Sequence, residues 1–151
     1  MSSLALEAGV DGRWRERAVA GFVFLLCCGL LGLGSLLEAT AAGYGTHEQI
    51  GMPPCGFLRI SGIPCVTCGM TTAFTHAVHG RLFDALSTQP AGALIAVAVA
   101  ATAIVSGYAM AGGLSLLGLW RLLWRPRVVV AAAAIVLAAW VYKIMILHSG
   151  V

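Results

Sequence analysis

Three long apolar segments restrict this chain to a membrane environment. Residues 18–37 form a run of 20 residues without a charged side chain, and residues 91–120 form a second such run of 30. Residues 128–147 form a third run of 20, in which the one charge is Lys143 near its end. About 20 apolar residues suffice to cross the hydrocarbon layer as a helix. We therefore predict an all-α integral membrane protein with three transmembrane helices.

The composition agrees with these segments. Charged residues make up 10% and hydrophobic residues 60% of the 151 residues, whereas a soluble domain averages about 25% charged residues. The net charge of +3 is small and scattered, which argues against a nucleic-acid partner. We expect the lipid bilayer as the main partner and a single membrane domain, residues 1–151.

The second and third segments each raise a question of geometry. At about 1.5 Å per residue, a helix over residues 91–120 would exceed the hydrocarbon thickness, so we expect it to tilt, emerge or break near Gly112 and Gly113. Lys143 lies near the end of the third span, where we expect its long side chain to reach the headgroups. Glu38, just after the first span, is expected at the same surface and is a candidate partner for Lys143.

The basic residues before the first span also suit a cleaved signal peptide. Its apolar run is long for a signal core, and the nearest sequence with the spacing of a cleavage site is Ala39-Thr40-Ala41. We expect an uncleaved first helix.

The orientation in the membrane follows from two groups of arginines. Three spans would place both groups on the same side, and arginines in short loops favour the cytoplasm. We expect a bacterial inner-membrane protein with a cytoplasmic N-terminus, a periplasmic C-terminus and a periplasmic segment between the first two spans. The two groups are Arg13, Arg15 and Arg17, and Arg121, Arg125 and Arg127.

The chemistry of this chain is concentrated in residues 51–90. This segment holds three of the five cysteines and four of the five prolines. A short helix is expected from Cys65 or Thr67 to His79, because Pro64 precedes it and Gly80 follows it. Another helical turn is expected over residues 84–88. On the first of these helices, steps of three and four residues predict one polar face, formed by Cys65, Cys68, Thr72, His76 and His79.

These residue types predict a metal site. Cys65-x2-Cys68 has the spacing of a two-thiolate chelate for tetrahedral zinc. Cys55 and a histidine, His76 or His79, would complete a Cys3His set. Thiolates also suit copper(I) and iron–sulfur clusters. The candidate metal ligands are therefore Cys55, Cys65, Cys68 and His76, with zinc as the candidate cofactor.

Two other interpretations remain open at this point. A CxxC motif at the start of a helix has its thiolate stabilised by the helix N-terminus, which would suit a thiol–disulfide oxidoreductase using Cys65 and Cys68. Disulfides also persist in the periplasm, so Cys55 could instead be bonded to either of these cysteines as a structural crosslink.

The segment from Cys55 to Thr72, CGFLRISGIPCVTCGMTT, resembles a bacterial membrane family known as domain of unknown function 2752. The family pattern is roughly C-P-F, then T-G-x-P-C-P-x-C-G-x-T-R, then Asn-Pro before a long span. Here Gly56 and Val66 stand where the family often has proline, Thr72 where arginine is common, and Gln89 in place of the asparagine. The resemblance extends over residues 55–92. It implies a small multi-span helical protein with a cysteine-rich outer segment whose three cysteines act together, and it implies no particular activity.

The functional hypothesis follows from size as well as from the cysteines. Three helices bury little surface among themselves, so partners in the membrane or a homo-oligomer are expected. We expect a non-enzymatic inner-membrane protein whose Cys/His cluster organises the outer segment through a metal or a disulfide, as a subunit or accessory of a larger assembly. The alternative is a membrane thiol–disulfide oxidoreductase. No catalytic residue is assigned.

Overall fold

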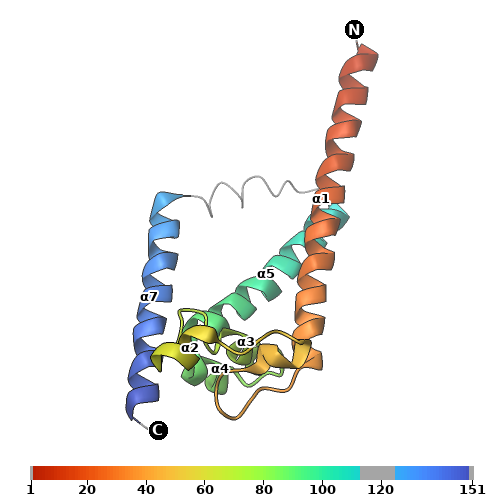
Figure 1. Ribbon diagram of the computed structural model, residues 1–151. Coiled ribbons are helices and arrows are strands. Elements are labelled where there is room, and N and C mark those ends of the chain that lie inside the picture. Colours follow the sequence, from red (N-terminus) through yellow and green to blue (C-terminus); the bar gives the residue numbers. More distant parts are fainter. Residues whose placement is uncertain (1, 113–124, 150–151) are drawn as a thin grey trace.

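The computed structural model describes residues 2–112 and 125–149, and this part of the chain contains helices and no strand. Three long helices and several short ones make up the fold (Figure 1). The elements are α1 (Ser2–Leu36), the 3-10 helix η1 (Thr46–Ile50), α2 (Gly56–Ser61), α3 (Met70–Val78), α4 (Leu82–Thr88), α5 (Pro90–Gly112) and α7 (Pro126–Ser149).

The predicted all-α, three-span class is confirmed. Within residues 2–112 and 125–149, three helical segments are long and apolar enough to cross a membrane: Arg13–Leu36, Pro90–Gly112 and Pro126–Ile146. Helix α1 begins well before the predicted first span, at Ser2. The part of the predicted second span beyond Gly112 lies outside the described residues, as does Arg121.

Helices α1 and α5 pack against each other through small residues. A Cβ atom on Gly107 would lie 3.3 Å from the ring of Phe24, so α5 approaches α1 closely at this point. At the end of α5, the Arg17 guanidinium donates hydrogen bonds to the carbonyl oxygens of Met110 and Ala111, at 2.9 and 3.1 Å. Carbonyls in the last turn of a helix lack partners within that helix. Arg17 therefore both joins the two spans and caps α5.

The short helices gather at one end of the spans (Figure 1). Helix α3 fits between α1 and α5 because the facing residues are glycine and alanine. A Cβ on Gly92 would lie 2.7 Å from the Met70 carbonyl oxygen, and one on Gly34 would lie 2.8 Å from the Phe74 ring. A small buried core forms beside this contact, from Ala73, Ala85 and Ala93.

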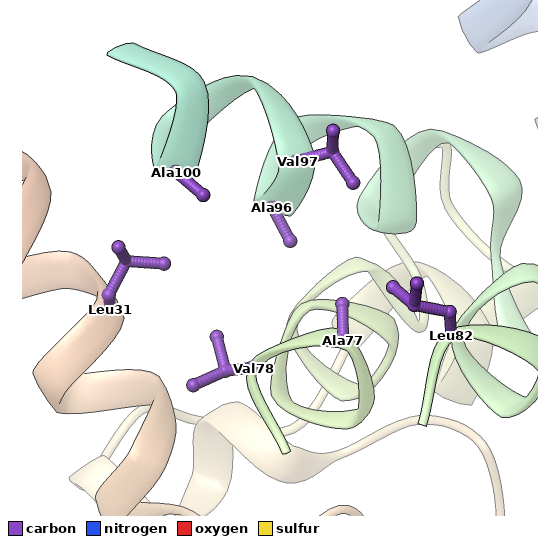
Figure 2. Close-up of a pocket in the computed structure, with 7 residues that line it drawn as sticks. All are labelled: Leu31, Ala77, Val78, Leu82, Ala96, Val97 and Ala100. Atoms are coloured by element: carbon purple, nitrogen blue, oxygen red, sulfur yellow. The ribbon is translucent and has the colours of Figure 1, made fainter. Parts of the chain in front are cut away.

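A cavity of about 450 Å³ lies between α1, α3 and α5 (Figure 2). Binding sites for small molecules usually add a few polar groups that orient the ligand. The side chains that line this cavity are all aliphatic: Leu31, Ala77, Val78, Leu82, Ala96, Val97 and Ala100. The cavity therefore suits a hydrocarbon group and offers no polar side chain for a reaction or for binding a metal.

The short helices correct one prediction and confirm another. The helix expected from Cys65 or Thr67 begins only at Met70, because Gly69 has a left-handed backbone with φ +84°. Cys65 and Cys68 lie in the preceding turn, in which the Cys68 N–H donates to the Cys65 carbonyl at 3.0 Å. The predicted polar helix face carrying both cysteines is therefore wrong. The short helix expected over residues 84–88 is present as α4.

Candidate metal centre

A chain reversal brings Cys55 back to the later cysteines. Cys55 is the N-cap of α2, and α2 ends at Gly62, whose left-handed backbone (φ +69°) turns the chain. The Gly62 N–H donates to the Leu58 carbonyl at 3.0 Å, which closes this turn. The segment that separates Cys55 from Cys65 in sequence thus forms one compact loop, and both cysteines end up on the same side of it.

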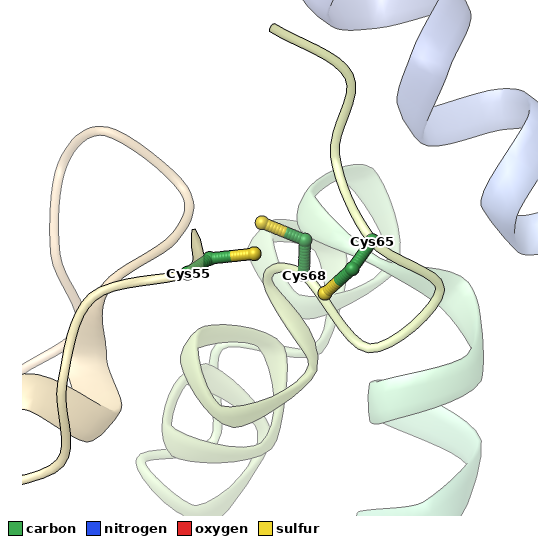
Figure 3. Close-up of side chains that lie close together, drawn as sticks. All are labelled: Cys55, Cys65 and Cys68. Atoms are coloured by element: carbon green, nitrogen blue, oxygen red, sulfur yellow. The ribbon is translucent and has the colours of Figure 1, made fainter. Parts of the chain in front are cut away.

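The three thiols point toward one another (Figure 3). The sulfur atoms of Cys55, Cys65 and Cys68 all lie within 4.8 Å of one another. A tetrahedral zinc ion with Zn–S bonds of about 2.3 Å separates its sulfurs by about 3.8 Å. Side-chain adjustments of an ångström or less would therefore let the three sulfurs hold one ion. All five cysteines of the chain are free in the structure.

Burial differs among the three thiols and shifts their acidity. Cys68 is buried, whereas Cys55 and Cys65 are partly exposed. Burial raises the pKa of Cys68 to about 11, and the negative charges of Cys65 and Cys55 add to this rise. The pKa of Cys55 is lowered, chiefly by a hydrogen bond from the backbone of Leu58. A bound cation would relieve the mutual repulsion of the thiolates, as metal binding to cysteines does in general.

The structure brings three of the four predicted ligands together and leaves His76 out of the group. The Nδ1 atom of His76 is buried without a hydrogen-bond partner. Burial lowers the pKa of His76, and the positive charge of Arg81 lowers it further. His79, the other candidate, instead donates from Nδ1 to the Thr75 carbonyl of its own helix at 2.8 Å.

Comparison with known protein families identifies the segment that carries this cluster. Residues 55–103 match the family described as Protein of unknown function (DUF2752). The match begins at Cys55, contains all three clustered cysteines and continues into α5, which confirms the resemblance seen in the sequence. No curated protein and no solved structure matches the chain. We refer to residues 55–103 as the DUF2752 segment.

A lysine from outside the DUF2752 segment lies beside its cysteine turn. Lys143 on α7 is only 4% exposed, and its Nζ donates to the carbonyl oxygens of Gly43 and Thr88, at 3.1 Å each. The predicted extension of Lys143 to the headgroups, and its pairing with Glu38, are therefore wrong. The backbone of Glu38 instead exchanges hydrogen bonds with the side chain of Gln49. The sequence did contain an indication that Lys143 is buried at a specific site. Lys143 is the one charged residue in its span, and charged residues within spans are often functional.

Two other side chains of α7 reach the DUF2752 segment. The indole N–H of Trp140 donates to the Pro64 carbonyl at 2.9 Å, one residue before Cys65. The Tyr142 hydroxyl donates to the Ser87 carbonyl at 3.2 Å. Together with Lys143, these bonds attach α7 to the cysteine turn, to the end of α4 and to the loop before η1.

Buried polar side chains support the segment from within. Thr72, expected on the cysteine face, is fully buried and its hydroxyl lies 2.8 Å from that of Thr46. Gln89, where the family pattern has asparagine, is also fully buried. Its Nε2 lies 3.5 Å from the Val66 carbonyl, and its Oε1 has no hydrogen-bond partner. Gln89, between α4 and α5, therefore contacts the cysteine turn directly, and Thr46 of η1 supports α3, the helix that follows the turn.

Proposed function

We propose that this protein is a small non-enzymatic membrane protein whose Cys55, Cys65 and Cys68 hold one thiophilic metal ion, with zinc as the first candidate. The observation that carries this proposal is the convergence of the three sulfurs, all within 4.8 Å of one another. Convergence this close suits a single ion, whereas the outer sulfurs of an iron–sulfur cluster must stand farther apart. Three thiolates satisfy the preference of zinc for sulfur and leave a fourth position.

We infer that the fourth ligand of the ion is either water or His76. His76 would have to move toward the sulfurs, because its ring nitrogens lie outside their group. Its buried Nδ1 without a partner supports this assignment, because such atoms are rare unless a ligand or water satisfies them.

We also propose a periplasmic location for the cysteines in a bacterial inner membrane, with the N-terminus in the cytoplasm and the C-terminus in the periplasm. Helix α1 ends, α5 begins and α7 ends near the short helices (Figure 1). Arg13, Arg15, Arg17, Arg125 and Arg127 therefore lie toward the other end of the spans. Arginines gathered at one end favour the cytoplasm for that end.

The uncovered spans support an accessory role in a larger membrane assembly. Many large apolar side chains of all three spans are exposed, among them Phe22 on α1, Ile104 on α5 and Val130 on α7. Lipid covers such surfaces, and helices of partner proteins or of a second copy can cover them equally well. A metal-bound loop would give such a partner a rigid surface outside the bilayer.

Metal analysis of the purified full-length protein tests the central claim. We expect one zinc ion per chain and loss of stoichiometric zinc in each of C55S, C65S and C68S. The matched control is C28S, which removes a cysteine of α1 outside the cluster. H76Q tests the fourth ligand. Wild-type protein that carries no stoichiometric thiophilic metal and contains an intramolecular disulfide would overturn the proposal.

The unequal exposure of Cys65 and Cys68 supports the alternative function, a thiol–disulfide oxidoreductase. Cys65 is partly exposed and Cys68 is buried, as befits an attacking and a resolving cysteine. The Cys65 thiolate would attack a substrate disulfide and release one substrate thiolate. Cys68 would then displace the second, which leaves a Cys65–Cys68 disulfide and a reduced substrate. Stoichiometric reduction of a model disulfide by the reduced, metal-free protein would favour this alternative.

A further inference from the structure

The ammonium group of Lys143 lies in an apolar span and still needs a partner for its charge. Moving a charged side chain into a membrane or protein interior costs several kcal/mol unless it is paired and hydrogen-bonded. An ammonium group has three N–H donors. Two of them are taken by the carbonyl oxygens of Gly43 and Thr88, which are neutral acceptors. These bonds satisfy two donors but do not neutralise the charge, because both acceptors are uncharged.

The cysteine turn lies directly against this ammonium group. A Cβ atom on Gly69 would lie 3.2 Å from both Nζ and Cε of Lys143. Gly69 immediately follows Cys68, the buried cysteine of the cluster. The positive charge of Lys143 opposes the rise in the pKa of Cys68 that burial causes, so the ammonium and the thiol interact electrostatically.

The charges of the proposed centre indicate what the lysine contributes. Three thiolates and a divalent ion sum to a charge of −1, and the ammonium of Lys143 brings the total to zero. A buried group with no net charge avoids most of the penalty of removing charge from water. Without the lysine, the same centre would place an uncompensated negative charge beside the apolar ends of three spans.

We propose that Lys143 is the counter-cation of the three-cysteine centre and increases its affinity for a divalent thiophilic ion. Lys143 is a positioning residue, since it would act on the ion through Cys68 and would not ligate it. This inference rests on the proposed metal-binding function and adds a specific role for the C-terminal span.

Cadmium titration of the full-length protein in detergent tests this role. The absorbance of Cd–thiolate bonds reports both the affinity and the number of thiolates bound. We expect K143Q, which keeps N–H donors but removes the charge, to bind Cd²⁺ about 10–100-fold more weakly, as typical for residues that support metal ligands. K143M should behave in the same way, and K143R, which keeps the charge, should retain most of the affinity. The control Y142F removes a neighbouring hydrogen bond of α7 without changing charge.

The possible results separate the two proposals. Absence of Cd²⁺ binding in the wild type defeats the metal-centre proposal and the role of Lys143 with it. Equal affinity in wild type and K143Q overturns the role of Lys143 and leaves the metal centre standing. If K143R loses as much Cd²⁺ affinity as K143Q, or if Y142F loses a similar amount, the effect is one of packing. Either result also overturns the role of Lys143 as counter-cation. The absorbance at saturation should correspond to three thiolates in every variant, which shows that the loop is still folded.

Discussion

At the scale of single residues, Gly69 decides where the cysteine turn ends and α3 begins. Its left-handed backbone ends the cysteine turn and starts α3, and its missing side chain leaves room for both Gly43 and Lys143. A Cβ there would lie 2.7 Å from the Gly43 carbonyl oxygen. Contacts under 3.0 Å to a backbone atom require the chain to move. Both demands together make glycine necessary at this position.

We predict that G69A destabilises the protein by more than the backbone strain alone. A non-glycine residue in the left-handed region costs about 1 kcal/mol, and the clash with Gly43 adds to this. The matched control is G51A, because Gly51 has a similar φ of +80° and open space around it. Unfolding in denaturant should show a larger loss for G69A than for G51A. Equal losses would show that the close contact does not matter.

The pKa values predict a pH-dependent order of reaction for the thiols. Only the thiolate reacts with alkylating reagents. The pKa of Cys55 is lowered and that of Cys68 is raised to about 11. In metal-free protein, Cys55 should therefore react before Cys68 near neutral pH, and Cys68 should become reactive only as the pH approaches 11. Mass spectrometry of alkylated peptides across pH measures this order, and equal rates at neutral pH would contradict it.

At the scale of elements, α7 is attached to the rest of the chain mainly through side chains near its C-terminal end. Trp140 donates to the Pro64 carbonyl beside Cys65, whereas Tyr142 and Lys143 donate to carbonyls at the end of α4 and in the loop before η1. Helix α1, in contrast, packs along α5 through close contacts at Gly21 and Gly107. Among the described residues, side-chain hydrogen bonds to the short-helix region therefore hold the third span, whereas close glycine contacts hold α1 to α5.

We predict that W140F weakens the attachment of α7. The variant keeps an aromatic ring and loses the indole N–H that binds the Pro64 carbonyl. A buried hydrogen bond contributes about 0.5–1.5 kcal/mol to stability, so the unfolding midpoint in detergent should fall accordingly. W14F is the control, because Trp14 is 72% exposed on α1. An effect of W14F as large as that of W140F would argue against a specific role for this bond.

At the scale of the whole molecule, the cysteines and the basic residues lie at opposite ends of the spans. The cysteine cluster lies at the end of the spans away from Arg125 and Arg127, which stand at the start of the third span. If the arginines face the cytoplasm, the cysteines face the periplasm. Topology is thus one choice between two orientations, and a single labelling experiment decides it.

We predict that a membrane-impermeant maleimide labels Cys55 in intact cells when Cys55 is the one cysteine kept in the chain, because its thiol then shares no metal with Cys65 and Cys68. Cys55 is partly exposed and more acidic than an ordinary thiol, so it should react readily where the reagent reaches it. In a background without other cysteines, R125C should stay unlabelled until the membrane is opened, because Arg125 is at the opposite end of α7. Labelling of R125C but not of Cys55 in intact cells would reverse the orientation.

Much of the fold could be predicted from the residues alone, because the free energy of placing a helix in lipid depends mainly on the residues of that helix. Each uncharged run favours a helix in lipid whatever the rest of the chain does, so three spans follow from hydropathy. The grouping of Cys55, Cys65 and Cys68 also followed from their spacing and from the family resemblance. Helix boundaries were less secure, since the start of α3 depends on Gly69 and on contacts with Gly43 and Lys143.

What the amino-acid sequence determined by itself was therefore the number of spans and the identity of the clustered cysteines. The tertiary structure alone decided that His76 stands apart from the sulfurs and that Lys143 lies against Gly69, the residue after Cys68. Lys143 follows Cys68 by 75 positions (143 − 68), and no local pattern connects residues so far apart. The physical reason is that a span depends on the apolar residues next to one another in sequence. The position of a buried charge depends instead on groups, often distant in sequence, that can accept its hydrogen bonds.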